Sequence, residues 1–517
     1  MSANAFWNIA FGAYRFAVNR GDLTYRLQET ETGTLWADGV CLGTIEIIER
    51  ETATATRYSF GDLKLISLSE KSGATGKRIL FGLDAPGRIP VDVYLTCTER
   101  EIQLTVEASR DTKTHQVGEI VLFPGLCAVA EDGESHLVIP HREGIILRAE
   151  EAPEGTTPLR IWEGDTGLTM PFVGAVRVLD AGVRSALALL TDSAYGVADL
   201  SRAADSAQLD LRYARDPERR RLDMRVVLMP GGDHVSIARA YRDRIIGEGG
   251  HVTLRKKTRE KPALVAWLDG DETAAVVRRQ VTLPPDKNRW IAMEEAIQDA
   301  RDNVPKNTVY IADLCGDWTV PFVDAWRYVA PPRFGVAVPL LGVVHHDATP
   351  LCFDTLANNG KSFLRALLYL APPVPPHTPP SHVGVLHPLH ALSFGAFLTE
   401  HRFLTPDSAV EEARYSNGAR IVINGSAVED YETEELHLPP LGFLAAHPQM
   451  IAYYALRVKE ETFDEPAWRV QKSQDGKRLE ESAVVQRYLF GLGGELRSSA
   501  GSAIAQGAPG VPSEHGE

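Results

Sequence analysis

The stretch NTVYIADLCGDW, residues 307–318, has the features of a buried strand that ends on an acid. The apolar, β-prone run 309–312 is followed by Asp313, and Gly316 and Asp317 lie in the loop that follows. A polar residue at a strand end either begins a loop or belongs to a site, because ligands bind at the carboxyl ends of parallel strands in α/β folds. Both interpretations of Asp313 are open at this point.

The surrounding segment alternates strand-like and helical runs. PALVAWLDG (262–270) and VAVPLLGVVHHD (336–347) have the composition of strands, whereas WIAMEEAIQDARDN (290–303) and LHALSFGAFLTEHRFL (389–404) have helical spacing. Near-continuous apolar strands between helices indicate a parallel sheet that is covered on both faces. We therefore predict a shortened (β/α) barrel-like domain over residues 251–405.

Short β-prone runs make up the two ends of the chain. In residues 1–250 many runs alternate apolar and polar residues, as EIQLTVEA does, which is typical of strands with one solvated face. Residues 406–497 again show short strands, with Asn417-Gly418 as a hairpin turn. The predicted fold class is multidomain α+β: an N-terminal β-supersandwich, the barrel-like domain, a C-terminal β-sandwich, and a disordered tail over 498–517.

Composition limits the partners that the chain can bind. The 517 residues carry a formal charge of −15 and no block of basic residues, which disfavours nucleic acid and anionic membranes. No apolar run reaches the roughly 18 residues of a membrane helix, and the N-terminus lacks the pattern of a signal peptide. Five widely spaced cysteines without a CxxC pair indicate a reduced, cytoplasmic protein. No cofactor is predicted, and the oligomeric state is not indicated.

Three of the strand-like runs in the central segment finish on an aspartate: Asp269, Asp313 and Asp347. Paired carboxylates at the carboxyl ends of barrel strands suit glycoside hydrolysis, in which one carboxyl group protonates the leaving oxygen and the other attacks the anomeric carbon or activates water. The alternative is structural, because aspartate commonly begins loops and caps helices. Asp313 and Asp347 are the predicted catalytic pair, and Asp269 is a predicted substrate contact.

Other residues near these strand ends are candidates for binding. Trp318, His345 and His346 are predicted to contact a sugar, although core aromatics are at least as common. Adjacent residues of a strand point to opposite faces, so His345, His346 and Asp347 are not expected to bind one ion together, and no metal is predicted. In IPHREG (139–144), a loop tip is the simple interpretation; a His141–Glu143 pair on a mutarotase-like sandwich is the alternative.

Several motifs, in their order along nearly the whole chain, resemble bacterial relatives of glycoside hydrolase family 101, the endo-α-N-acetylgalactosaminidases. LVIPHREGIIL (137–147) resembles a strand and loop of their supersandwich. VYIADLCG resembles the strand that carries the family nucleophile, which maps onto Asp313, with Gly316 as the following glycine. The resemblance implies a supersandwich, a barrel and a small sandwich, a carbohydrate ligand, and retaining hydrolysis of an α-linked sugar.

The sequence departs from the family pattern in the central domain. A (β/α)₈ barrel takes about 250 residues, many more than residues 261–405 provide. The family's acid/base Glu lies on a strand beyond the nucleophile, but here that window holds Asp317 and Asp324 and no Glu. Two hypotheses follow: a retaining glycoside hydrolase with Asp313 as nucleophile and Asp347 as acid/base, or a non-catalytic carbohydrate-binding or scaffold protein.

Overall fold

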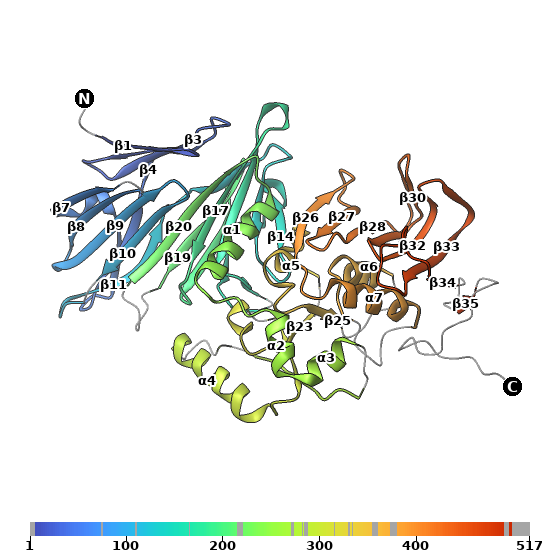
Figure 1. Cartoon of the computed structure of the whole chain (residues 1–517). Helices are drawn as coiled ribbons and strands as arrows, with labels where there is room; N and C mark the ends of the chain where they lie inside the picture. Colours follow the sequence, from blue (N-terminus) through green and yellow to red (C-terminus); the bar gives the residue numbers. More distant parts are fainter. Residues whose placement is uncertain are drawn as a thin grey trace.

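The computed structural model describes residues 6–498, apart from 74–75, 109–110, 165, 215–220, 270–272, 282, 284–287, 315, 329–330, 333, 354–359, 373–379 and 491–495. The chain runs from a large β region, through a mixed region with most of the helices, to a second β region (Figure 1). The predicted tail lies outside the described residues except for Ser498. No helix within the described residues is long and apolar enough to cross a membrane.

The N-terminal region contains three antiparallel sheets. The smallest consists of β1 (Phe6–Phe11), β2 (Tyr14–Asn19), β3 (Thr24–Glu29) and β4 (Leu35–Cys41). The seven-stranded sheet consists of β15 (Thr156–Arg160), β18 (Gly196–Arg202), β19 (Ser206–Tyr213), β11 (His115–Leu122), β5 (Gly43–Glu49) and β6 (Thr54–Ser59), with β12 (Cys127–Ala130) paired to β19.

The third sheet of this region has ten strands and reaches into the central segment. In order it contains β24 (Val336–Ala337), β14 (Ile145–Arg148), β13 (His136–Ile139), β16 (Phe172–Val178), β17 (Arg184–Thr191), β20 (Arg221–Pro230), β10 (Ile102–Ala108), β9 (Ile89–Thr98), β8 (Gly76–Ala85) and β7 (Lys64–Gly73). In β9, buried and half-buried residues alternate along the whole strand, as the period of two requires when one face lies on the core. Strand β24 therefore ties the central segment to this sheet.

Helix α1 (His234–Gly247) leads from the first region to the centre. Asp233 caps it by accepting a hydrogen bond from the backbone N–H of Ser236 at 2.9 Å. Its buried residues include Ile237, Ala238 and Tyr241, which share one helical face because they are three and four positions apart.

The central region contains one parallel sheet, ordered β21 (Val276–Arg279), β22 (Val309–Asp313), β23 (Ala325–Tyr328) and β25 (Leu351–Phe353). Its helices are α2 (Leu254–Glu260), α3 (Pro262–Leu268), α4 (Arg289–Asn303), α5 (Leu340–His345), α6 (Lys361–Leu368) and α7 (Pro380–Ser393). The parallel sheet is the one that the sequence predicted, but the described residues give it only four strands and do not close it into a barrel.

Three predictions of local structure in this region are wrong. Residues 262–268 form helix α3, which Pro262 begins at a position where its missing N–H costs nothing. Residues 340–345 form helix α5, and all six are buried; a helix that is buried all round has no polar stripe to distinguish it from a strand. The helix predicted to continue to residue 404 ends at Ser393, and a strand follows.

That strand opens the C-terminal sheet, which runs β26 (Leu398–Phe403), β27 (Val410–Tyr415), β28 (Arg420–Asn424), β31 (Phe443–His447), β32 (Met450–Val458), β33 (Glu461–Ser473), β34 (Val485–Phe490) and β35 (Leu496–Ser498). The short strands β29 (Tyr431–Glu432) and β30 (Leu436–Leu438) pair with each other, and β30 joins β32. Asn417-Gly418 connects β27 to β28 as predicted, with Gly418 at φ +86°.

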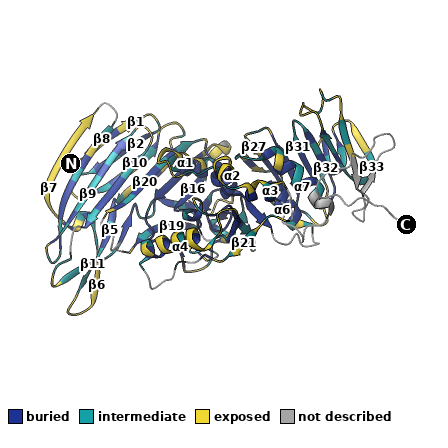
Figure 2. Ribbon diagram, turned by 60° about the horizontal axis from the view of Figure 1, so that its bottom comes forward, coloured by how far each residue is buried: buried dark blue, intermediate teal, exposed yellow. Residues whose placement is uncertain are grey.

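Two large apolar cores hold these layers together. One fills the N-terminal sandwich. The other extends from the ten-stranded sheet through α1, the parallel sheet, α5 and α6 to the C-terminal sheet, and includes Phe172, Trp326, Leu367 and Ile421. Figure 2 shows buried residues, in dark blue, in both β regions and in the central region between them. Because a shared core excludes water, it fixes the carboxyl edge of the parallel sheet against both neighbouring β regions.

Candidate functional site

Asp313 ends β22 at the carboxyl edge of the parallel sheet, as predicted. Arg327 is its register partner on β23 and donates from Nε to Oδ1 at 2.6 Å. The side chain of Asp313 is 23% exposed. It lies on the same face of the sheet as Val309 and Ile311, which pack into the core formed with α2 and α3.

Asp347 does not lie at a strand end, because it follows helix α5. Arg242 donates to both of its carboxylate oxygens, at 2.8 and 2.7 Å, and His251 donates at 3.0 Å. Burial acts to raise the pKa of Asp347, but the hydrogen bonds from Arg242 and His251 outweigh burial and hold this pKa well below its ordinary value. A carboxylate held in this way stays ionised at neutral pH and does not suit the role of proton donor.

His345 and His346 are buried and point to different partners. His345 donates from Nε2 to Asp317 Oδ2 at 3.4 Å, and its ring meets that of Trp326 edge-on. His346 donates from Nδ1 to the carbonyl of Ala396 at 2.6 Å. Burial lowers the pKa of both imidazoles, so both stay neutral near pH 7. These contacts join the end of α5 to neighbouring elements of the interior.

Asp317, in the short 3₁₀ turn Asp317–Thr319, accepts hydrogen bonds from several elements. Trp162 donates to Oδ1 at 2.7 Å, and Tyr241 donates to Oδ2 at 2.5 Å. With His345, these donors come from the N-terminal sandwich, α1 and α5. Asp317 is therefore the point at which the loop after β22 is fixed to the rest of the molecule.

The other two predicted contacts are Trp318, which is the next residue of the same turn, and Asp269. Trp318 is half-buried and its ring lies 5.6 Å from that of Phe322. Asp269 is exposed and follows α3, where its backbone N–H continues the helical hydrogen bonding to Val265. Of the three aspartates predicted at strand ends, only Asp313 ends a strand. The three carboxylates thus belong to separate local environments.

The opposite face of the same sheet edge carries a second group of residues. Tyr328 and Phe353 are the last residues of the neighbouring strands β23 and β25, and their rings stack at 4.5 Å. Tyr328 directs its hydroxyl toward Oε1 of Glu143 at 3.3 Å. Tyr369, just after α6, lies with its ring 6.4 Å from that of Phe353. We call Glu143, Tyr328, Phe353, Arg365 and Tyr369 the edge cluster.

Glu143 reaches this edge from the loop that was interpreted as an exposed tip. The loop is buried, and the backbone carbonyls of Glu143 and Gly144 accept hydrogen bonds from the backbone N–H groups of Leu341 and Val338 at 3.1 and 2.9 Å. Its carboxyl group is fully buried. Burial raises the pKa of Glu143 to about 7, against the smaller opposing effect of Arg365. A carboxyl group with a pKa in this range can act as a general acid at neutral pH.

Arg365 lies between two acids. Its Nη1 donates to both oxygens of Glu411, at 2.7 and 2.9 Å. Within the described residues, Glu143 Oε2, Arg365 Nη2 and Tyr369 OH are buried without a hydrogen-bond partner. Buried polar atoms in native proteins are almost always satisfied by protein, water or ligand. A polar ligand at the edge cluster would therefore supply hydrogen bonds to these three buried atoms.

Sequence reasoning missed most of this cluster. Glu143 was weighed only as part of a pair with His141, and the structure buries both residues but directs His141 Nδ1 to the carbonyl of Gly167 at 2.8 Å. A usable signal was Arg365, the single charge inside the apolar run FLRALLYL, since a charge in a buried helix needs a partner.

The described residues contain no group of three or more His, Cys, Asp or Glu that could hold a metal ion.

Solved glycosidases share this fold. No protein-family model and no curated protein matches the sequence. The α-N-acetylgalactosaminidase NagBb from Bifidobacterium bifidum, in its GalNAc complex, aligns over 81% of this chain and 98% of its own at 12% identity, with a TM-score of 0.60. Its Gal-NHAc-DNJ complex aligns over the same shares at 12% identity with a TM-score of 0.63. A β-arabinopyranosidase reaches a TM-score of only 0.39, too low to support an inference.

The fold is therefore glycoside-hydrolase-like, which is the coarser part of the resemblance inferred from the motifs. Identity as low as this shows a shared fold and nothing about the reaction, since one fold supports many functions. The function has to be argued from the residues of this chain.

Proposed function

We propose that this protein binds a carbohydrate at the carboxyl edge of its parallel sheet, through the edge cluster, and that it is a non-hydrolytic relative of the glycoside hydrolases. The proposal is carried by the buried polar atoms of Glu143, Arg365 and Tyr369 that have no hydrogen-bond partner among the described residues. Sugar hydroxyls both donate and accept hydrogen bonds, so one ring can satisfy a carboxyl group, a guanidinium and a phenol together. The rings of Tyr328 and Phe353 offer the apolar surface against which a sugar ring packs.

The partners of the two predicted catalytic acids favour binding without hydrolysis. Asp313 is paired with Arg327, and Asp347 is held by Arg242 and His251. A retaining mechanism needs a nucleophile and a proton donor on the same substrate, about 5–5.5 Å apart. The low pKa of Asp347 does not favour its role as the donor.

The first test measures binding and turnover together. Methyl α-N-acetylgalactosaminide is a suitable probe because the NagBb fold was solved with GalNAc. We expect calorimetric binding by the wild-type protein, about tenfold weaker binding by Tyr369→Phe, which loses one hydrogen bond, and unchanged binding by Asp313→Asn. Across a panel of α- and β-aryl glycosides, we expect no release of the aryl group. Unchanged affinity in Tyr369→Phe, or no binding of any neutral sugar, would contradict the proposal.

A second candidate, retaining hydrolysis with Asp313 as nucleophile, is favoured by one observation. Glu143 carries the raised pKa that a proton donor needs, and it lies at the carboxyl edge at which Asp313 ends β22, on the opposite face of the sheet. If aryl glycosides are cleaved, Asp313→Asn should abolish cleavage, and the effects of Glu143→Gln and Asp347→Asn would identify the donor. In a true donor variant, aryl glycosides with good leaving groups keep more of their activity than poor ones, because they need less protonation.

A further inference from the structure

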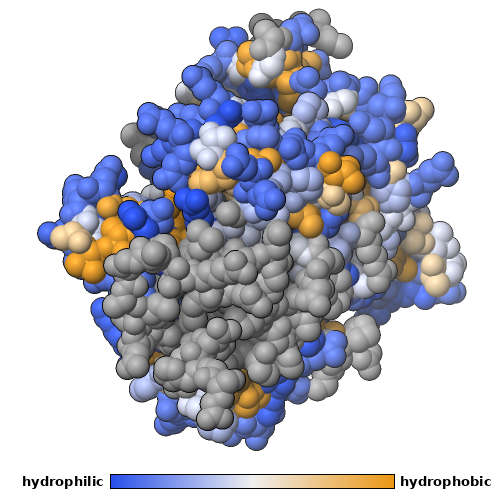
Figure 3. Space-filling model, turned by 90° about the vertical axis from the view of Figure 1, so that its right-hand side faces the viewer, coloured by the Kyte–Doolittle hydropathy of each residue, from blue (hydrophilic) through white to orange (hydrophobic). Residues whose placement is uncertain are grey.

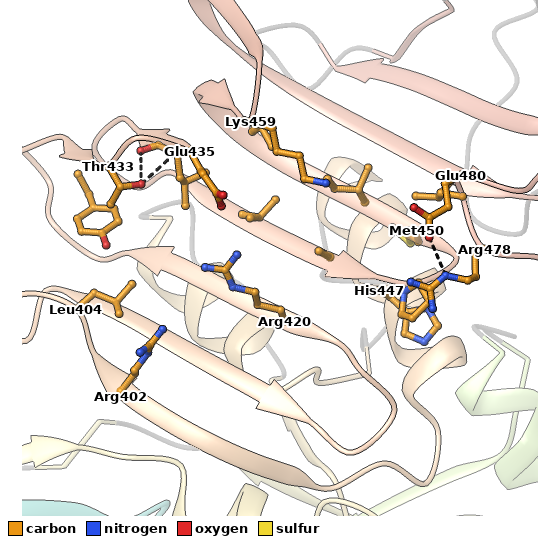
Figure 4. Close-up of a pocket in the computed structure, with 18 residues that line it drawn as sticks. Arg402, Leu404, Arg420, Thr433, Glu435, His447, Met450, Lys459, Arg478 and Glu480 are labelled. Carbon is orange, nitrogen blue, oxygen red and sulfur yellow. Dashed lines mark hydrogen bonds and ion pairs between the residues drawn. The ribbon is translucent and has the colours of Figure 1, made fainter.

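The C-terminal sheet contains a cavity of about 500 Å³ that lies outside the edge cluster. This volume lies within the range of small-molecule sites, about 300–1,000 Å³. In Figure 4, Lys459 and Glu435 lie on one side of the cavity and Arg402 and Leu404 on the other. Arg420 lies between these sides, and His447, Arg478 and Glu480 close one end.

The lining of this cavity is partly apolar, and we call its apolar residues the floor. It includes Leu436, Leu444, Met450, Ile451 and Val458. Leu436, Leu444 and Val458 belong to a small core of their own, separate from the large core that supports the parallel sheet. The described surface at this end of the molecule is mainly hydrophilic, with separate apolar areas (Figure 3). An apolar floor inside a polar rim suits the C–H face of a sugar ring, whose edge carries hydroxyls.

The rim has an excess of positive charge in a protein whose formal charge is −15. Arg402 and Arg420 share one buried carboxylate, that of Glu412, which Arg414 also contacts. Because one carboxylate does not neutralise several guanidinium groups, the N–H groups of Arg402 and Arg420 are available to a second anion.

Lys459 adds a further cation to the rim. Its ammonium makes no hydrogen bond or ion pair within the described residues, whereas Arg478 on the rim pairs with Glu480 at 2.9 Å. Lys459 is held in place by its backbone, which donates to the carbonyl of Glu435 at 2.6 Å. Figure 4 shows its side chain across the cavity from Arg402.

We propose that this cavity binds a sugar residue that carries a carboxylate, with the ring on the apolar floor and the carboxylate between Lys459 and the guanidinium groups of Arg402 and Arg420. Guanidinium groups match carboxylates through paired N–H donors. The acids and the hydroxyl of the rim, at Glu435, Glu480 and Thr433, suit the hydroxyls of the same ring. This site is independent of the carbohydrate site proposed at the edge cluster.

The test compares an oligosaccharide of four galacturonic acid units with the neutral galactose oligosaccharide of the same linkage and length. We expect the acidic oligosaccharide to bind and the neutral one not to compete at this cavity. Lys459→Gln should weaken binding about tenfold, because it removes one charge-assisted contact. Binding should also weaken as salt is raised. Lys71→Gln, a change at an exposed position of β7, is the matched control and should leave binding unchanged.

Arg402→Gln is a second variant, which tests the same site if the Lys459→Gln protein does not fold. The side chain of Arg402 is 59% exposed, so Arg402→Gln should fold and should also weaken binding of the acidic oligosaccharide. Equal binding of both oligosaccharides, or acidic binding that survives both substitutions, would overturn the proposal. Neither variant should alter binding of methyl α-N-acetylgalactosaminide, so the two proposed sites can fail separately.

Discussion

Glu143 is a buried carboxyl group whose few hydrogen-bond partners indicate a binding site. Charged side chains are costly to bury without a full set of partners, and Glu143 has one long contact to Tyr328 and an oxygen with no partner in the described part of the chain. Asp347 is the opposite case, because two cationic or polar neighbours fill its hydrogen-bonding capacity. The two acids therefore titrate in opposite directions from their ordinary values.

This difference predicts a pH dependence of stability for Glu143. Its pKa is raised from 4.5 to about 7 in the folded protein, so folding binds a proton between these values. The stabilisation from the protonated form is complete below pH 4.5 and is lost as the pH rises to about 7, by up to about 3 kcal/mol. Urea unfolding of wild type and Glu143→Gln across this range should show the variant gaining relative stability as pH rises. A constant difference between the two proteins would contradict the buried environment of this carboxyl group.

The loop that carries Glu143 depends on its close contact with helix α5. Gly144 has φ +122°, and a Cβ at this position would overlap the side chain of Leu340, the first residue of α5. The loop and the helix therefore approach each other at a distance that only glycine permits.

Substitution of this glycine should be unusually destabilising. Gly125→Ala is the matched control, since Gly125 also has positive φ, at +71°, but nothing within 4 Å of its Cβ position. We expect Gly125→Ala to cost about 1–2 kcal/mol from the backbone alone, and Gly144→Ala to cost about 1–3 kcal/mol more because of the overlap. Chemical denaturation measures both free energies of unfolding. Equal costs would mean that α5 moves aside freely and does not fix the loop.

The core shared by the ten-stranded sheet, the parallel sheet and the C-terminal sheet makes the central region dependent on its neighbours. The parallel sheet has four strands in the described residues, too few to enclose its own core as a closed barrel does. Residues such as Trp326 are buried by elements from several parts of the chain. The central region is therefore stabilised by packing against the ten-stranded sheet and the C-terminal sheet.

This arrangement predicts cooperative unfolding. Backbone amides of β22 in the parallel sheet and of β28 in the C-terminal sheet should exchange with solvent through the same opening, with equal free energies in native-state hydrogen exchange. Tyrosine and tryptophan signals should likewise show one thermal transition for these two regions. Exchange of β28 at a clearly lower free energy than β22 would show that the C-terminal sheet unfolds alone.

The amino-acid pattern was sufficient where burial leaves a periodic trace. The alternation in the N-terminal strands, the Asn417-Gly418 turn and the strand that ends on Asp313 follow from local chemistry. The periodicity failed for α3 and α5, because a buried helix and a buried strand are both continuously apolar. The predicted domain limits stay a prediction.

The edge cluster could not be read from the chain, because its members lie far apart in the sequence and meet through packing. Glu143, Tyr328 and Arg365 come from a sandwich loop, a parallel strand and a helix. Whether each carboxyl group is ionised depends on which partners the fold places around it, as Asp347 and Glu143 show. Local sequence sets secondary structure through short-range sterics and burial patterns, whereas a site depends on long-range contacts that exist only once the core has formed.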